Sequence, residues 1–190
     1  LHEGHLALGK EAKKENDFVV TSIFVNPLQF GPNEDFDEYP RDEEQDANHA
    51  KQAGVDVLFI PAMEEMYPKK MGIKIIVEEG TDVLCGRSRP GHFDGVGTVL
   101  TKLFHIVQPN NTYFGLKDAQ QYAVVHHLIE QLNFPVKING LRMVREQDGL
   151  AKSSRNVYLS DIERQEAIFL YESLQYAQKR VVDGIENPDI

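Results

Sequence analysis

His2-Glu3-Gly4-His5 stands directly before Leu6-Ala7-Leu8-Gly9-Lys10-Glu11-Ala12-Lys13-Lys14-Glu15, in which apolar residues recur at helical spacing. This pattern predicts a helix from about Gly4 to Glu15, with both imidazoles at its N-terminal end. Unpaired backbone N–H groups and the helix dipole favour an anion at that end. Gly4 has no side chain to keep the anion away from the backbone. The stretch therefore predicts an anion site where the helix begins.

Two simpler interpretations of these histidines stay open from the four residues alone. They can be ordinary surface histidines at the start of the chain, because short motifs also match by chance. A zinc site is a weaker interpretation, since the pattern H-E-x-x-H requires a histidine where Leu6 stands and no cysteine lies nearby.

A second candidate anion site lies far downstream in Lys152-Ser153-Ser154-Arg155, which follows Asp148-Gly149-Leu150-Ala151. Two hydroxyl groups between two cations are suited to phosphate oxygens, and the preceding residues indicate a flexible loop. A triphosphate held between this loop and the histidines would explain both motifs.

Composition narrows the class of protein. The 190 residues are 41% hydrophobic and carry a net charge of −10, which argues against nucleic acid or an anionic membrane as the main partner. The lone Cys85 cannot form an internal disulfide, is expected to be a small packing residue, and indicates a cytoplasmic protein. No apolar run reaches the length of a membrane span and no signal peptide is visible.

Strands and helices alternate along the chain, which predicts a doubly wound parallel α/β sheet. Residues 18–25 are almost continuously apolar and predict a buried strand, so that Gln29 lies just past its carboxyl end, where ligands bind in such sheets. Residues 31–42 form an acidic loop, and 63–71 and 86–97 are also predicted as loops. Further strands are predicted at 55–60, 73–77, 112–114 and 136–141, and helices at 42–53, 96–107, 118–132 and 160–183.

An ordered set of motifs resembles one family. Between the histidines and the K-S-S-R loop lie Phe24-Val25-Asn26-Pro27-Leu28-Gln29-Phe30-Gly31-Pro32, Ser88-Arg89-Pro90-Gly91-His92-Phe93 and Phe114-Gly115-Leu116-Lys117-Asp118-Ala119-Gln120-Gln121. Together they resemble the pantoate–β-alanine ligase family of the H-x-G-H nucleotidyltransferases. The resemblance implies a Rossmann-like nucleotide-binding domain at 1–143 and, at 144–190, the start of a small, truncated C-terminal domain. It also implies a further strand before His2 and a homodimer.

The resemblance implies ATP-dependent condensation of (R)-pantoate with β-alanine through a pantoyl adenylate, with Mg²⁺ bound to ATP. Carried over by motif, the catalytic residues are His2, His5 and Lys117. Pantoate would contact Gln29 and Gln121, and β-alanine would contact Gln29. The residues implied in ATP binding are Leu1, His2, Glu3, Gly4, His5, Gly115, Leu116, Lys117, Asp118, Val144, Lys152, Ser153, Ser154 and Arg155.

Some of these residues also fit other roles. Asp118 is implied as the residue that orients magnesium, yet with Gln121 it also forms an N-cap pair for the following helix. Gln121 falls on a stripe with Val125, Leu128 and Leu132, where a buried amide needs a polar partner. Leu116 and Lys152 depart from the family pattern, in which Glu and Met are frequent at these positions.

Two rival functions remain. Another H-x-G-H enzyme would make a nucleotide product, but Asn26-Pro27-Leu28-Gln29-Phe30 favours a pocket for a small carboxylic acid. A nucleotide-binding module without catalysis is the other rival, and the presence of His2, His5, Lys117 and Arg155 argues against it.

Overall fold

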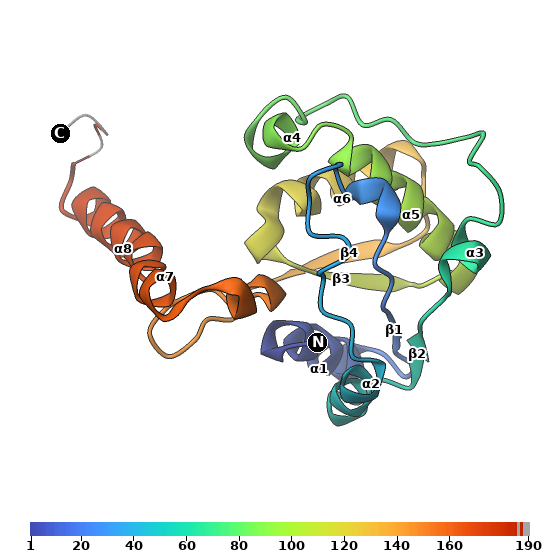
Figure 1. The fold of residues 1–190 in the computed structure, drawn as a ribbon, viewed down its shortest axis with the longest axis horizontal. Helices are drawn as coiled ribbons and strands as arrows, with labels where there is room; N and C mark the ends of the chain where they lie inside the picture. The colour runs from blue at the N-terminus through green and yellow to red at the C-terminus, as the bar shows by residue number, and fades with distance from the viewer. Residues whose placement is uncertain (186, 188–190) are drawn as a thin grey trace.

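The computed structural model describes residues 1–185 and 187, in which helices and parallel strands alternate (Figure 1). The strands are β1 (Val20–Ser22), β2 (Val57–Phe59), β3 (Asn111–Gly115) and β4 (Lys137–Leu141). The α-helices are α1 (Glu3–Glu15), α2 (Glu43–Gln52), α3 (Met63–Met66), α4 (Leu84–Ser88), α5 (His92–Val107), α6 (Ala119–Gln131), α7 (Asp161–Glu166) and α8 (Phe169–Val182). The described residues also form the 3₁₀ turns η1 (Pro27–Gln29), η2 (Leu116–Asp118) and η3 (Ser154–Tyr158).

The predicted parallel pairing is confirmed, in two separate ladders. β1 lies beside β2 with Val20 opposite Val57, and β3 lies beside β4 with Asn111 opposite Lys137. The strand predicted at 18–25 is longer than the observed strand β1, which covers Val20–Ser22. Both ladders run parallel, as the alternation of strands and helices requires.

The strand predicted at 73–77 is wrong within the described chain. This segment runs over α5 without a strand partner, and side chains of that helix take up its backbone groups. The Ile75 N–H donates to Thr98 Oγ1 at 3.0 Å, and the Val77 N–H donates to Asp94 Oδ1 at 2.9 Å. A buried backbone donor needs a partner, and here hydroxyl and carboxylate oxygens replace a neighbouring strand.

Helical structure also appears where loops were predicted. α3 lies inside the predicted loop at 63–71, and α4 overlaps the first residues of the predicted loop at 86–97. α5 begins at His92 rather than at residue 96. The final helix is not continuous from residue 160 to 183, because α7 ends at Glu166 and α8 begins at Phe169. Its start is as predicted, with the Ser160 side chain and Glu163 in a capping box.

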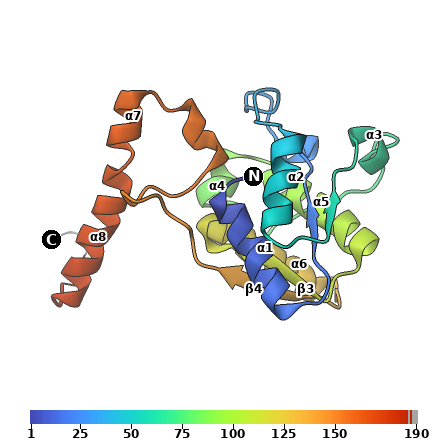
Figure 2. The same ribbon diagram turned by 90° about the horizontal axis from the view of Figure 1, so that it is seen from below.

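The core forms where α5 and α6 pack on the ladder of β3 and β4. Figures 1 and 2 show α1 on the other side of this ladder. The buried residues of the cluster are Phe93, Val96, Phe104, Val124, Val125, Ile129 and Val136. This packing fixes the ends of β3 and α1 relative to each other, which positions the candidate site.

The last two helices extend away from this body (Figures 1 and 2). α8 exposes apolar side chains, including Phe169, Leu174 and Val182. None of the helices in the described part of the chain has the length and apolar character needed to cross a membrane. Cys85 is exposed, so its predicted packing role is wrong.

Candidate active site

The two histidines cap the first helix and hold each other in place. The Gly4 N–H donates to His2 Nδ1 at 3.1 Å, and the His2 N–H donates to His5 Nδ1 at 3.2 Å. These bonds form a reciprocal capping box built from imidazoles, with the ring centroids 4.0 Å apart. A side chain at Gly4 would meet the His2 ring, since a Cβ there lies 2.8 Å from His2 Cε1.

This hydrogen-bond pattern assigns the protons of both rings. Because each Nδ1 accepts from a backbone N–H, a neutral ring must carry its proton on Nε2. Burial lowers the pKa of His5 to about 4, and burial followed by the nearby Lys117 charge lowers the pKa of His2. Near neutral pH both histidines are therefore uncharged, and each keeps one Nε2–H that can donate to an anion.

The structure brings the downstream K-S-S-R segment to the same helix end. Lys152 Nζ lies 3.3 Å from Glu3 Oε2, and the Lys152 Cβ lies 4.0 Å from where a Gly4 Cβ would stand. The Lys152 N–H donates to the Val144 carbonyl at 3.0 Å, which places Val144 beside this segment. The Leu1 amino group pairs with the Asp46 carboxylate of α2.

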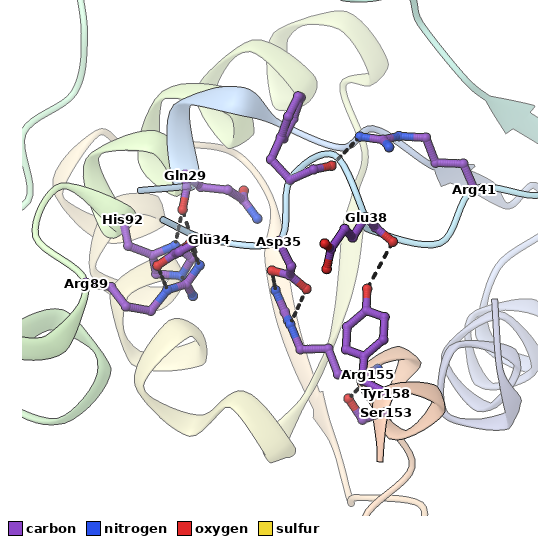
Figure 3. A network of polar contacts seen from close by, with 11 residues as sticks. Gln29, Glu34, Asp35, Glu38, Arg41, Arg89, His92, Ser153, Arg155 and Tyr158 are labelled. Atoms are coloured by element: carbon purple, nitrogen blue, oxygen red, sulfur yellow. Dashed lines mark hydrogen bonds and ion pairs between the residues drawn. The ribbon is translucent and has the colours of Figure 1, made fainter. Parts of the chain in front are cut away.

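Arg155 faces a different partner, the acidic loop at 31–42. Its Nε and Nη2 donate to Asp35 at 2.9 and 2.8 Å (Figure 3), and this hydrogen bonding lowers the pKa of the Asp35 carboxyl. The Ser153 hydroxyl accepts from the Arg155 N–H at 3.2 Å and caps η3, whose first residue is Ser154. Arg155 is therefore neutralised by a carboxylate, and Ser153 already has a backbone donor.

Gly115, Leu116, Lys117 and Asp118 lie at the carboxyl end of β3, where η2 leads into α6. Lys117 Nζ lies 3.7 Å from Asp118 Oδ2, and the Asp118 side chain is 62% exposed. Asp118 occupies the N-cap position of α6, as the sequence left open, but its side chain makes no capping hydrogen bond there. Within residues 1–185 and 187, no group of three or more His, Cys, Asp or Glu side chains could hold a metal ion.

Gln29 and Gln121 come from η1 and the first turn of α6. The Gln29 Oε1 accepts from Asn26 Nδ2 at 3.2 Å, and Asn26 itself is 1% exposed. The side chain of the half-buried Gln121 makes no hydrogen bond to the residues that the structure describes. Its predicted stripe is buried at Val125 and Leu128 but ends before Leu132, which is 46% exposed.

A network that the sequence did not predict surrounds Gln29 (Figure 3). Arg89 Nε and Nη2 donate to Glu34 at 2.7 and 2.6 Å, and His92 Nδ1 lies 2.8 Å from the Gln29 carbonyl oxygen. Both residues belong to Ser88-Arg89-Pro90-Gly91-His92-Phe93, which lies in the loop that the sequence predicted at 86–97. One feature of the sequence could have indicated that His92 is buried: it stands directly before the apolar Phe93, where α5 begins in the structure.

A sequence profile of the pantoate-beta-alanine ligase family matches residues 1–189. The pantothenate synthetase of a Geobacillus strain is 61% identical over 189 residues, and that of Bacillus pumilus is 62% identical over 184. The matches cover 100% and 97% of this chain but 67% and 64% of those proteins. The chain thus spans about two thirds of the length of these relatives.

Solved structures agree in fold. The pantothenate synthetase of Thermus thermophilus superposes with a TM-score of 0.95 at 52% identity, covering 97% of this chain and 67% of that one. The Francisella tularensis enzyme, solved in complex with beta-gamma ATP and beta-alanine, superposes with a TM-score of 0.87 at 42% identity. That match covers 92% of this chain and 67% of the other. The chain belongs to the pantoate-beta-alanine ligase family.

Proposed function

We propose that the protein condenses (R)-pantoate with β-alanine at the expense of ATP, through a pantoyl adenylate. One observation carries the proposal: His2 and His5 keep two neutral Nε2–H donors at a helix N-terminus, close to the positive charges of Lys117 and Lys152. This arrangement suits a triphosphate, because donors and cations converge without an internal anion between the imidazoles. Family membership supports the same reaction.

The first chemical step joins two anions. A pantoate carboxylate oxygen attacks the α-phosphorus of ATP, the bond to the bridging oxygen breaks, and pyrophosphate leaves. We assign His2, His5 and Lys117 to the charge that develops on phosphate oxygens, where removing one donor typically costs a hundredfold or more in rate. The β-alanine amine then attacks the acyl carbon, loses a proton and expels AMP, which leaves the amide.

The remaining ATP contacts are assigned by position. Glu3 and Gly4 lie in the first turn of α1, Gly115 and Leu116 lie at the end of β3, and Lys152 reaches the helix from across the site. Ser153, Ser154 and Arg155 would meet the phosphates once Arg155 leaves Asp35. Leu1 and Val144 would lie at the periphery of the nucleotide.

Asp118 would orient the magnesium ion that accompanies ATP. The largely exposed Asp118 carboxylate, which makes no capping bond, would be the residue that holds Mg²⁺, since this ion takes few protein ligands when ATP supplies others. The ion, when bound, neutralises part of the charge on the triphosphate.

Gln29 and Gln121 would bind pantoate, and Gln29 would also contact β-alanine. Asn26 Nδ2 donates to Gln29 Oε1, so the Nε2 of Gln29 is the end left to donate to a substrate oxygen. Gln121 offers an amide without an internal partner in the described chain. The Francisella relative, crystallised with a nucleotide and beta-alanine, supports two of the three substrates. A domain boundary at residues 143/144, a cytoplasmic location and a homodimer stay predictions.

Isotope exchange tests the reaction order. With ATP, magnesium and pantoate, but without β-alanine, the protein should exchange labelled pyrophosphate into ATP. Another nucleotidyltransferase would show no exchange that depends on pantoate, and a passive binder would show none with any acid. Because this chain spans part of its relatives, the assay should be run on it and on a version extended to their length. An extended protein that binds ATP and pantoate yet needs β-alanine for exchange would refute the two-step mechanism.

A further inference from the structure

We propose that His92 and Arg89 are positioning residues that fix the pantoate pocket by holding the main chain of Gln29. The proposal rests on the proposed function, in which the Gln29 side chain contacts pantoate. Neither residue is assigned a contact with substrate. Their effect passes through one carbonyl oxygen, that of Gln29, which ends η1.

The hydrogen bonds of this group define its protonation. Arg89 Nη1 lies 3.1 Å from His92 Nε2, and a guanidinium can only donate. His92 Nε2 is therefore the acceptor, so the ring proton is on Nδ1. That proton is directed at the Gln29 carbonyl, 2.8 Å away, and Arg89 Nη2 donates to the same oxygen at 3.3 Å.

The group is built into the interior rather than laid on the surface. His92 is 8% exposed, its ring packs 4.9 Å from that of Phe93, and burial lowers its pKa. Arg89 is anchored in turn by two bonds to the Glu34 carboxylate, as Figure 3 shows. A neutral ring of fixed tautomer between a paired guanidinium and a carbonyl has one stable arrangement, which makes it a rigid support.

The opposite side of η1 explains why such a support is needed. Gly95 of α5 touches the η1 backbone so closely that a Cβ there would lie 2.2 Å from the Leu28 carbonyl oxygen. Asn26 Nδ2 donates to the Gly95 carbonyl oxygen at 3.0 Å and to the side-chain oxygen Oε1 of Gln29 at 3.2 Å. η1 is thus fixed on its N-terminal side by Asn26 and on its C-terminal side by His92, with a longer contact from Arg89 to the same carbonyl oxygen. Loss of the second contact frees the end that carries Gln29.

Three variants test the idea. His92→Leu removes the donor, whereas His92→Asn keeps a donor, Nδ2, near the position of Nδ1. His105→Leu changes a histidine at the other end of the same helix and serves as the control. In the pyrophosphate exchange assay, His92→Leu should raise the KM for pantoate about five- to twentyfold and change the KM for ATP less than twofold. His92→Asn should restore most of the difference, and His105→Leu should resemble the wild type.

A second measurement does not need activity. Hydrogen–deuterium exchange of the amides in residues 26–30 should speed up at least fivefold in His92→Leu, and stay near the wild-type rate in His92→Asn and His105→Leu. Arg89→Met should give a smaller increase in the exchange rate of the same amides. This variant replaces His92→Leu in the test if His92→Leu does not fold. Unchanged exchange in His92→Leu or Arg89→Met, or equal rises in the two KM values, would overturn the proposal. A wild type without pantoate-dependent exchange of pyrophosphate would refute the proposed function instead, while the amide exchange would still decide about His92.

Discussion

The two halves of the candidate triphosphate site are prepared in opposite ways. The histidine end is held by bonds within residues 2–5, and its donors are neutral. The K-S-S-R end is held by ion pairs with distant carboxylates, Lys152 with Glu3 and Arg155 with Asp35. The first half is ready for an anion as it stands, whereas the second must exchange a carboxylate for a phosphate.

The difference has an energetic meaning. Donors that are already aimed need no reorganisation when charge develops, so they contribute most to the transition state. Arg155 is bound by both oxygens of Asp35, whose side chain is 19% exposed, so a triphosphate must first displace this carboxylate before it can bind the guanidinium. We therefore expect the histidine end to control rate and the K-S-S-R end to control nucleotide affinity. The following predictions test that division, from the largest effect to the smallest.

His5→Ala should slow pantoate-dependent pyrophosphate exchange about a hundredfold, the scale for losing one transition-state donor. The fold should persist, since a lost helix cap costs about 1 kcal/mol. Exchange rates and circular dichroism check both points. His127→Ala on the exposed side of α6 is a control that should keep full activity. Near wild-type turnover of folded His5→Ala would remove this residue from the mechanism.

Stability should fall at acid pH partly because of His5. Its pKa is about 4 in the folded chain, below the ordinary value of 6.5, so between these values only the unfolded chain takes up the proton. His5 therefore contributes stability above pH 6.5 that is lost as the pH drops toward 4. In urea unfolding, the free energy of unfolding of the wild type minus that of His5→Asn should fall by about 2–3 kcal/mol from pH 7 to about pH 4.5. A difference independent of pH would show that the His5 pKa is not lowered.

Asp35→Asn should lower the KM for ATP about two- to fivefold. Without the charged carboxylate, the ATP phosphates no longer compete with Asp35 for Arg155. The turnover number should change little. Glu38→Gln is a matched control in the same loop, since Glu38 contacts Tyr158 only through its backbone carbonyl. A raised KM in Asp35→Asn would mean that Asp35 supports the nucleotide site rather than competing for it.

Lys152→Met should have the smallest effect, a rise of about twofold in the KM for ATP. Its partner Glu3 is largely exposed, so the pair is well screened by solvent. The difference from wild type should disappear as salt increases from 0.02 to about 0.5 M, where the Debye length becomes short. A tenfold effect that persists in salt would place Lys152 with the histidines, and the division between the two halves would fail.

Patterns of local origin were predicted well. The helix at 3–15 and the short strand at 111–115 follow from spacing and turn residues within each segment. Ser160 and Glu163 correctly predicted the start of α7 for the same reason, since a capping box involves only four consecutive residues. Failures occurred where a distant side chain decided the outcome, as Thr98 and Asp94 did for residues 73–77.

The sequence by itself determined the family, the parallel α/β class and the residues at the helix end. The family follows from the order of short motifs along the chain, and the fold class follows from hydrophobic periodicity within each segment. Tertiary structure alone decided that Arg155 is paired with Asp35, that the Asp118 side chain makes no capping bond to α6, and that His92 contacts the Gln29 carbonyl. Asp35 and Arg155 lie 120 residues apart, and His92 and Gln29 lie 63 apart. Contacts of that kind depend on how packed elements place single atoms, and no local pattern in the chain encodes them.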